Sequence, residues 1–291
     1  MSTFLVEFSQ LLAVSFVAGA VGSLLGLGGG IIIVPIMTLF LHIDFRAAAG
    51  ASLIAVIATS SGSAAAYVRD RLANIRVGML LEILTALGAI TGALLSGLFA
   101  APLLFVVFAL ILMYSLVPTA QKIFFELRGK TPSHEATQSA ASSRIALALK
   151  LEGSYFDPAQ RRLIEYRLRR VPLGAGIMYI AGLASGMLGI GSGAFKVLAM
   201  DGVMGMPIKS STATSNFMIG VTAAASAGIY FSRGDIDPFV AAPVALGVLA
   251  GSLFGARILP RIAGLGIRIA FIVVISVISV QMLLHGLGVG G

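Results

Sequence analysis

Long apolar segments separated by short polar connections follow one another along most of the chain. They occupy residues 4–27, 47–68, 77–98 and 102–125, and then residues 172–190, 210–231, 238–256 and 265–285. An α-helix needs about 20 apolar residues to cross the ~30 Å hydrocarbon core of a bilayer. These segments therefore predict membrane-spanning helices.

Two further apolar segments, residues 30–41 and 194–206, are too short to span a bilayer alone. The first follows the glycine cluster Gly26-Leu-Gly-Gly-Gly30, and the second follows Gly189-Ile-Gly-Ser-Gly193. Short apolar segments interrupted by glycine are typical of the discontinuous helices of transporters. We predict that each short segment is half of a broken helix or a re-entrant segment.

The composition agrees with a protein that lies in lipid. Of the 291 residues, 58% are apolar and only 11% are charged, and the mean hydropathy is +1.00. Soluble domains usually carry about 25% charged residues. The predicted fold class is all-α, a polytopic membrane protein, and the length allows at most about ten crossings.

Net charge and ligand-type residues exclude several functions. The charge of +8 lies mainly in short loops, so it indicates membrane orientation rather than nucleic-acid binding. The chain has no cysteine and only His42, His134 and His285, widely spaced, so we expect no disulfide, no metal site and no cofactor. Because Glu7 interrupts the first apolar run and no basic stretch precedes it, we also expect no cleavable signal.

One long polar stretch, residues 126–171, divides the apolar segments into two sets of five. Its density of basic residues predicts a cytoplasmic location. Alternation over residues 145–152, the turn signal Asp157-Pro158 and the extended character of residues 163–170 predict a small β-hairpin. A basic interfacial helix capped by Asp157 is the alternative. The nine basic residues are Arg128, Lys130, Arg144, Lys150, Arg161, Arg162, Arg167, Arg169 and Arg170.

The two sets of segments are related by an internal repeat. Residues 22–71 align with residues 185–234 at a constant offset of 163 without a gap. A four-residue slip in the next loop then aligns Gly88 and Gly92 with Gly247 and Gly251. Ordered matching over this length indicates a duplication. Among the aligned pairs are Gly26 with Gly189, Gly28 with Gly191, Gly30 with Gly193, Ser52 with Ser215, and Tyr67 with Tyr230.

The chain is therefore expected to contain a first transmembrane repeat at residues 1–125, a basic cytoplasmic loop at 126–171 and a second transmembrane repeat at 172–291. If the short segments cross the membrane, each half has five segments and the repeats are inverted. If they do not cross, each half has four crossings and the repeats are parallel. The charge rule favours inverted repeats, because inversion brings Arg257, Arg261 and Arg268 to the same side as Arg69, Arg71 and Arg76. Eight and ten crossings both stay open at this point.

The two glycine clusters are the first candidate for a binding site. A break frees backbone N–H groups, and the positive N-terminal end of the following half-helix attracts anions. Duplicated breaks beside short segments point to the substrate site of a transporter. Alternatively, the glycines serve only close helix packing. The candidate residues are Gly28, Gly29, Gly30, Gly191, Ser192 and Gly193.

Lys196 lies within the second short segment, where a charge needs a partner or a task. It is a candidate ligand for an anionic substrate, with Asp201 as its counter-ion or as a proton acceptor that couples transport to an ion gradient. The alternative is a structural Lys–Asp pair, or a lysine that reaches the interface. Glu82, the other membrane acid, lies near the basic loop and could reach interfacial water.

Stretches rich in hydroxyl groups follow both short segments. Hydroxyls and amides are neutral donors, which bind an oxyanion without trapping it. In membrane helices, however, Ser and Thr often bond only to their own backbone. Asn216 carries more weight than the single hydroxyls because an amide is costlier to bury. The candidate ligands are Ser52, Thr214, Ser215 and Asn216.

At these residues the sequence resembles the sulfite exporter TauE/SafE family, also known as the toluene sulfonate uptake permease family. The resemblance rests on Gly22-Ser-Leu-Leu-Gly-Leu-Gly-Gly-Gly30 with Pro35, and on Ser185-Gly-Met-Leu-Gly-Ile-Gly-Ser-Gly193 through Met206-Pro-Ile-Lys-Ser-Ser-Thr-Ala-Thr-Ser-Asn-Phe-Met-Ile-Gly220. It covers nearly the whole chain outside the central loop. It implies a secondary transporter of sulfur-containing anions such as sulfite, sulfonates or sulfoacetate. The second motif departs at Ser192, where the first has Gly29, and at Leu198, where the first has Pro35.

The sequence thus favours an anion transporter that works by alternating access, with its site near the membrane midplane between the halves. A channel-like anion pore is the alternative. An enzyme is disfavoured because the apolar segments hold no His or Cys cluster and no paired carboxylates. The expected location is the plasma (inner) membrane. The expected partners are the lipid bilayer, a small organosulfur or sulfur oxyanion and a coupling ion, proton or sodium, with a homo-oligomer left open.

Overall fold

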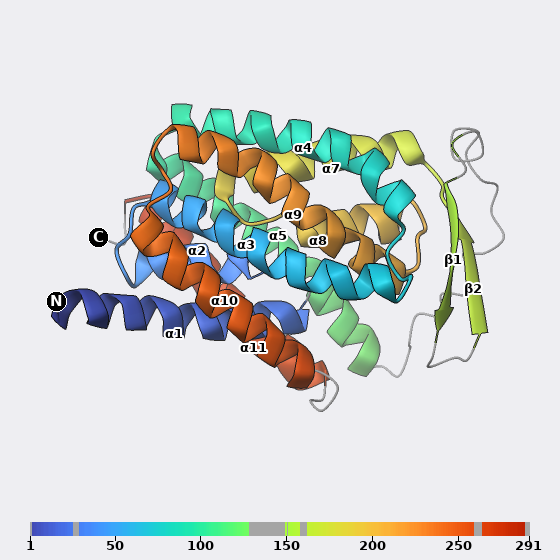
Figure 1. Ribbon diagram of the computed structural model, residues 1–291, viewed down its shortest axis with the longest axis horizontal. Coiled ribbons are helices and arrows are strands. Elements are labelled where there is room, and N and C mark those ends of the chain that lie inside the picture. Colours follow the sequence, from blue (N-terminus) through green and yellow to red (C-terminus); the bar gives the residue numbers. More distant parts are fainter. Residues whose placement is uncertain are drawn as a thin grey trace.

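The computed structural model describes residues 2–25, 29–127, 149, 151–157, 162–258 and 264–288. Most of these residues are helical (Figure 1). The first half contains α1 (Ser2–Leu25), α2 (Gly30–Leu39), α3 (Phe45–Arg69), α4 (Ile75–Leu98) and α5 (Ala101–Leu127). The hairpin strands β1 (Glu152–Asp157) and β2 (Arg162–Arg167) follow. The second half contains α7 (Val171–Leu188), α8 (Gly193–Val197), the π-helical turn η2 (Leu198–Val203), α9 (Ile208–Ser232), α10 (Pro238–Ile258) and α11 (Gly264–Gly286).

Every apolar segment predicted from the sequence is helical, and the predicted ends agree with the observed ends to within a few residues. The two short segments are confirmed as short. Helix α2 has 10 residues, and α8 has 5 before it continues into η2. At a rise of ~1.5 Å per residue, neither reaches across a bilayer by itself.

The central loop contains the predicted β-hairpin, but the first strand lies later than expected. β1 pairs antiparallel with β2, with Glu152 opposite Arg167 and Asp157 opposite Arg162. This pairing leaves four residues between the strands, so both strands lie next to the Asp157-Pro158 signal in the sequence. The alternation over residues 145–152 therefore predicts the strand too early, and residues 145–148 and 150 lie outside the described residues. The alternative of a helix that begins at Asp157 is wrong, because Asp157 ends β1 and Arg162–Arg167 is a strand.

Side-chain hydrogen bonds fasten the hairpin to one end of the helix bundle. The Tyr166 hydroxyl lies 2.9 Å from Ser210 Oγ at the start of α9 and accepts a hydrogen bond from Asn74 Nδ2 at 3.0 Å. Ser210 Oγ also lies 3.0 Å from the Leu72 carbonyl, between α3 and α4. Burial raises the pKa of Tyr166 above its ordinary value, so the phenol keeps its proton at physiological pH. These contacts bind the hairpin, the α3–α4 connection and α9 into one unit.

Helices of the first half pack mainly along helices of the second half. Helix α1 lies along α10, α4 along α7, α3 along α9 and α5 along α11 (Figure 1). Glycines bring the backbones of two of these pairs into contact. A Cβ at Gly88 of α4 would lie 2.1 Å from the Tyr179 carbonyl oxygen of α7, and one at Gly251 of α10 would lie 2.0 Å from the Phe16 carbonyl oxygen of α1. Small residues at such interfaces permit the close approach that drives helix packing in lipid.

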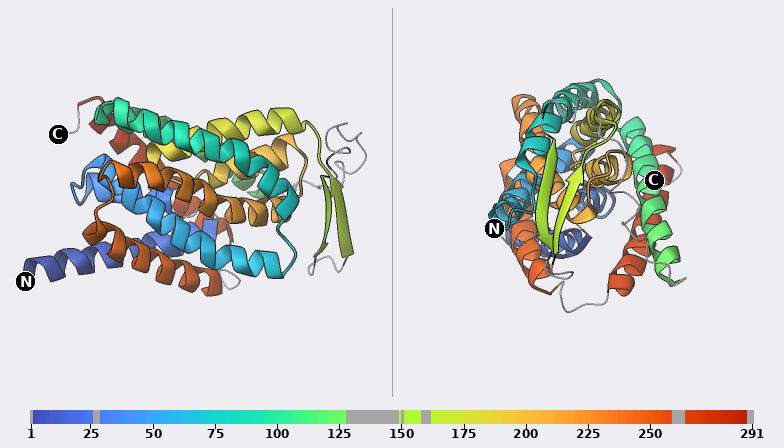
Figure 2. Two further views of the ribbon diagram at one scale, coloured as in Figure 1. Left: turned by 45° about the horizontal axis from the view of Figure 1, so that its top comes forward. Right: turned by 90° about the vertical axis from the view of Figure 1, so that its right-hand side faces the viewer.

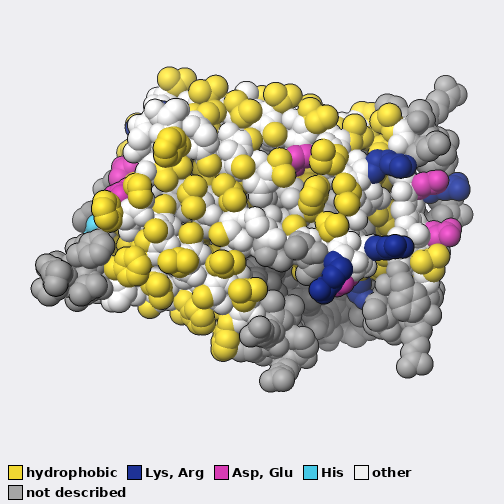
Figure 3. All heavy atoms as spheres, viewed as in Figure 1, with side chains coloured by type: hydrophobic (Ala, Val, Ile, Leu, Met, Phe, Trp, Pro, Cys, Tyr) yellow, Lys and Arg dark blue, Asp and Glu magenta, His cyan; other side chains and the backbone are white. Residues whose placement is uncertain are grey.

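The outer surface is apolar along the helices and basic at one end (Figure 3). Large apolar side chains such as Leu94, Ile180 and Val277 are more than half exposed, as expected for a lipid-facing surface. Within the described residues, Ile75–Leu98 and Val171–Leu188 are each long and apolar enough to cross a membrane, and shorter apolar stretches lie in α1, α2, α3, α5, α10 and α11. Lys and Arg gather at the end that carries the hairpin, while α1 begins and α11 ends at the opposite end (Figure 2).

The α4–α7 contact gives a test of the packing. A Cβ at Gly182 of α7 would lie 2.0 Å from the Thr85 carbonyl oxygen, whereas nothing lies within 4 Å of a Cβ at Gly176 of the same helix. We expect Gly182→Ala to destabilise the protein by about 1–3 kcal/mol through overpacking. Gly176→Ala is expected to be neutral or stabilising, because alanine favours the helix by about 1 kcal/mol. The measurement is thermal unfolding in detergent, and equal melting temperatures for the two variants would contradict this interface.

Candidate functional site

Both glycine clusters interrupt the helices at the predicted places. In the first break, Gly29 precedes α2 and has a φ of 77°. In the second break, Gly189 ends α7 with a φ of 70°, and Gly191 precedes α8 with a φ of 60°. A residue with a Cβ pays about 1–2 kcal/mol in this left-handed conformation, so glycine suits these positions. Gly26 and Gly28 lie outside the described residues.

The two breaks meet where α3 and α9 pack together. A Cβ at Gly30, the first residue of α2, would lie 3.0 Å from the Ile190 carbonyl oxygen in the other break and 2.7 Å from Ser52 Oγ of α3. Gly191 in turn contacts one side chain of α3 and one of α9, Val56 and Ile219. The sequence separates these two clusters by more than 150 residues, and the fold brings them into contact.

Buried hydroxyl groups surround this meeting point. Ser215 Oγ of α9 donates a hydrogen bond to the Gly193 carbonyl at 3.1 Å. The hydroxyls of Ser52, Ser185 and Ser192 are also buried, yet no hydrogen-bond partner for them is found in the part of the chain that the structure describes. A buried polar group without a partner costs about 1–3 kcal/mol. Among the described residues, the hydroxyls of Ser52 and Ser192 therefore leave hydrogen-bonding capacity beside the breaks that a ligand can use.

Lys196 is fully buried and extends from α8 toward α4 and α9. Its Nζ lies 3.4 Å from Glu82 Oε2 and donates a hydrogen bond to Thr222 Oγ1. Thr222 Oγ1 lies 2.6 Å from Glu82 Oε1, so the hydroxyl bridges the ammonium and the carboxylate. The alternative of a lysine that reaches the interface is wrong, because no part of the side chain is exposed.

The counter-ion of Lys196 is Glu82 rather than the Asp201 expected from the sequence. Glu82 is 5% exposed, so the interpretation that it reaches interfacial water is also wrong. Packing of α4 against α7 and α9 carries Glu82 into the interior, a contact that spacing along the chain does not reveal. One signal was available in the sequence. Buried charges occur in pairs, and Glu82 is the single acid within an otherwise apolar segment.

The structure does not bring all the predicted ligands to the breaks. Thr214 Oγ1 accepts a hydrogen bond from the Asn74 backbone N–H at 2.9 Å, which ties α9 to the α3–α4 connection. Asn216 Nδ2 donates to the Thr212 carbonyl of its own helix at 3.0 Å. The other described candidates do lie together at the breaks, namely Gly29, Gly30, Ser52, Gly191, Ser192, Gly193 and Ser215.

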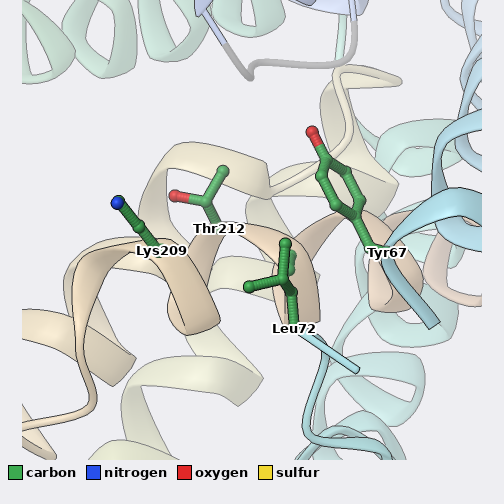
Figure 4. A pocket seen from close by; sticks show the side chains of 5 residues that line it. Tyr67, Leu72, Lys209 and Thr212 are labelled. Carbon is green, nitrogen blue, oxygen red and sulfur yellow. The ribbon is translucent and has the colours of Figure 1, made fainter. Parts of the chain in front are cut away.

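A shallow hollow of about 270 Å³ opens at the hairpin end, between the end of α3 and the start of α9 (Figure 4). Further into the bundle along these two helices, Ser60 of α3 donates a hydrogen bond to the Asn216 carbonyl of α9 at 2.6 Å and accepts one from the Gly220 N–H at 3.0 Å. Polar groups thus continue along the α3–α9 contact from the hollow toward the breaks. The hollow is lined by Tyr67, Leu72, Lys209, Thr212 and Ala213.

This arrangement suits the binding of an anion by neutral donors beside a buried ion pair. The hydroxyls of Ser52 and Ser192 and the positive end of α2 lie at the breaks. Lys196 lies one helical turn after Ser192, and its backbone N–H donates a hydrogen bond to the Ser192 carbonyl at 3.0 Å. Among the described residues, no group of three His, Asp or Glu side chains is placed to hold a metal ion.

The ion pair generates a stability prediction. Lys196→Met leaves the Glu82 carboxylate buried without its cation, which we expect to cost about 3–5 kcal/mol. The double variant Lys196→Met, Glu82→Leu removes both charges and should recover most of this loss. Thermal unfolding in detergent measures both effects. A double variant no more stable than Lys196→Met would contradict the pairing.

Comparison with known proteins agrees with the transporter interpretation. The family model described as Sulfite exporter TauE/SafE matches residues 11–282. The "Probable membrane transporter protein YunE" of Bacillus subtilis (strain 168) is 25% identical over 288 residues, which cover 97% of this chain and 99% of that protein. The "Probable membrane transporter protein YdhB" of the same strain is 24% identical over 248 residues, covering 85% of this chain and 88% of that protein. No solved structure matches the chain significantly. Because the family model spans both helix breaks and the buried ion pair, this chain belongs to the sulfite exporter TauE/SafE family of membrane transporters.

Proposed function

We propose that the protein is a secondary transporter of small sulfur-containing anions, of the sulfite, sulfonate or sulfoacetate class, and that it works by alternating access. The observation that carries this proposal is the meeting of the two helix breaks, with the unpartnered hydroxyls of Ser52 and Ser192 beside them. Sulfite and sulfonate oxygens are hydrogen-bond acceptors with negative charge, so they match these donors and the positive end of α2. Neutral donors also release the anion more readily than a cluster of arginines would.

The two halves of the chain are proposed to be structural repeats, residues 1–125 and 172–291, joined by the loop at 126–171. The helix starts support this proposal without any slip in the alignment. Each of four helices in the second half begins 163 positions after a helix of the first half. The pairs of first residues are Gly30 of α2 and Gly193 of α8, Phe45 of α3 and Ile208 of α9, Ile75 of α4 and Pro238 of α10, and Ala101 of α5 and Gly264 of α11.

The helix contacts support the same offset. Gly88 of α4 touches Tyr179 of α7 as Gly251 of α10 touches Phe16 of α1. Gly251 lies 163 positions after Gly88, and Tyr179 lies 163 positions after Phe16. Gly88 therefore corresponds to Gly251, and the four-residue slip that aligned it with Gly247 is unnecessary.

The repeats are proposed to be inverted, with the hairpin in the cytoplasm. Helix α1 begins at the end of the bundle opposite the hairpin, whereas α7 begins next to the hairpin (Figure 1). The first half must then pass between the two ends an odd number of times, which favours five segments over four. The gathering of Lys and Arg at the hairpin end favours a cytoplasmic location for that end.

Transport is tested with purified protein in liposomes. The substrates are sulfite, ethanesulfonate and sulfoacetate, with acetate and chloride as comparison anions and empty liposomes as the control. We expect saturable uptake of at least one sulfur anion, accelerated by the same unlabelled anion on the opposite side. Linear uptake without this acceleration would support the channel alternative. No uptake of any sulfur anion would refute the proposed substrate class.

The unpartnered hydroxyls allow the site to be tested without damage to the fold. We expect Ser52→Ala and Ser192→Ala each to weaken binding of the transported anion about tenfold or more, since a hydrogen bond to a charged group contributes about 1.5–3 kcal/mol. The melting temperature should not fall, because neither hydroxyl has a hydrogen-bond partner to lose among the residues that the structure describes. Ser226→Ala is the matched control, a buried serine bonded only to its own helix. Unchanged affinity in both variants would remove these hydroxyls from the site.

Membrane orientation is tested with single cysteines, because the chain has none of its own. Leu163 of β2 is 57% exposed, and Phe239 in the first turn of α10 is 70% exposed. Helix α10 begins at the end of the bundle opposite the hairpin (Figure 1). In intact cells we expect a membrane-impermeant maleimide to label Phe239→Cys, and to label Leu163→Cys only after permeabilisation. The reverse pattern would place the hairpin outside, and labelling of both in intact cells would contradict opposite locations.

A further inference from the structure

The buried ion pair interrupts the correspondence between the two halves. Glu82 on α4 and Lys196 on α8 correspond at the offset of 163 to Ala245 on α10 and Ile33 on α2. The bridging residue Thr222 corresponds to Thr59, whose hydroxyl bonds to the Ala55 and Val56 carbonyls of its own helix. The protein therefore carries one charged centre beside a site that is otherwise formed from both halves.

The ammonium group of Lys196 is not fully used in this state. An ammonium has three N–H donors. Among the described residues, Nζ has two hydrogen-bond partners, Glu82 Oε2 and Thr222 Oγ1. The third N–H of the Lys196 ammonium is therefore available to another acceptor. Lys196 itself lies one helical turn beyond Ser192, whose hydroxyl has no partner among the described residues.

A buried cation favours one negative charge beside it and penalises a second. In the state described here, Glu82 supplies that negative charge. An anion that binds Lys196 displaces Glu82 from this role and leaves its carboxylate buried without a counter-ion. An unpaired buried charge is so costly that the group becomes neutral instead, and a carboxylate becomes neutral by taking up a proton.

We propose that Glu82 and the transported anion alternate as the counter-ion of Lys196, and that Glu82 takes up one proton when the anion binds. The inference rests on the proposed transport of a sulfur-containing anion, and it identifies the coupling ion as a proton. The coupling group is then Glu82 rather than Asp201, because Glu82 is the carboxylate that contacts Lys196.

The charges balance at each stage for an anion with a single charge. The empty site holds an ammonium and a carboxylate, with no net charge. The loaded site holds an ammonium, the anion and a carboxylic acid, again with no net charge. No covalent bond changes except the O–H bond formed at Glu82. The protein then moves one anion and one proton together, and the occupied site carries no net charge across the membrane.

Other ionisable groups on the neighbouring elements do not contact the pair. Among the described residues, the hydrogen bonds and ion pairs of Lys196 and Glu82 are confined to the two groups themselves and Thr222. The hydroxyl of Tyr179 on α7 lies near Thr91, and that of Tyr230 on α9 bonds to the end of α7. The other ionisable side chains on the elements packed against the pair are Arg76 on α4, Asp201 on η2 and Lys209 on α9.

Proton uptake on binding is the direct test. Ethanesulfonate is the probe, because its charge does not change over the pH range of the experiment. Added to the detergent-solubilised protein in weak buffer with a pH dye, it should cause uptake of about one proton per bound anion. Glu82→Gln mimics the protonated acid, so it should bind ethanesulfonate without proton uptake. The matched control is Glu165→Gln in the hairpin, an exposed acid that should behave as the unmodified protein does.

The pH dependence gives a second readout. In the unmodified protein, the affinity for ethanesulfonate should fall about tenfold per pH unit over the pH range in which Glu82 is ionised in the free protein and protonated in the complex, because each bound anion brings one proton with it there. In Glu82→Gln the affinity should not vary between about pH 6 and about pH 8. In liposomes, an inward proton gradient should drive accumulation by the unmodified protein. Glu82→Gln should still exchange ethanesulfonate across the membrane without accumulating it.

Infrared spectroscopy keeps the test decisive if Glu82→Gln does not fold. Binding of ethanesulfonate to the unmodified protein should produce a carboxylic-acid carbonyl band in the infrared difference spectrum. Glu82→Asp keeps a carboxyl group and should shift that band, whereas Glu165→Gln should not.

The outcomes separate the two proposals. Binding of ethanesulfonate without proton uptake, or equal proton uptake in Glu82→Gln, overturns the coupling proposal and leaves the transport function standing. Loss of proton uptake in Asp201→Asn but not in Glu82→Gln also overturns it, in favour of Asp201. If the unmodified protein neither binds nor transports any anion of the sulfite, sulfonate or sulfoacetate class, the proposed function fails and the coupling proposal fails with it.

Discussion

A helix that breaks inside a bilayer releases backbone groups that no water can satisfy, so a break is tolerated only where protein surrounds it. This protein has two such breaks, and α3 contacts both of them. The two breaks contact each other, with Gly30 against Ile190. Helix α1 packs on α10 and α4 packs on α7 through glycines, and these contacts hold the helices on either side of the breaks in place. The candidate site is thus a consequence of covering two interrupted helices.

A second constraint acts on charge. Most of the site consists of backbone groups and hydroxyls that carry no net charge, and the ion pair of Lys196 and Glu82 joins it on one side only. Thr222 holds the pair together by bonding to both groups. The pair connects α4, α8 and α9, which belong to different halves of the chain. A change in the charge of either group would therefore alter contacts between the halves.

Local patterns predicted the elements well. Apolar runs located all the helices to within a few residues, because lipid demands a long apolar segment wherever a helix crosses. The glycine clusters located the breaks, since their positive φ angles favour residues without a Cβ. The hairpin was found through its turn, but its first strand was displaced. Alternation over residues 145–152 predicts an extended chain without specifying which residues pair, whereas the signal Asp157-Pro158 lies where β1 ends.

Partners of single side chains were harder to predict. Sequence reasoning paired Lys196 with the nearby Asp201, whereas the carboxylate that reaches it is 114 residues away on α4. Thr214 was grouped with the site ligands, yet it caps the Asn74 backbone near the hairpin. The sequence by itself determined the helices, the two breaks and the presence of a buried charge, because these depend on composition and spacing along the chain. Only the tertiary structure decided which groups meet, because the contacts among α3, α4, α8 and α9 depend on how helices pack side by side.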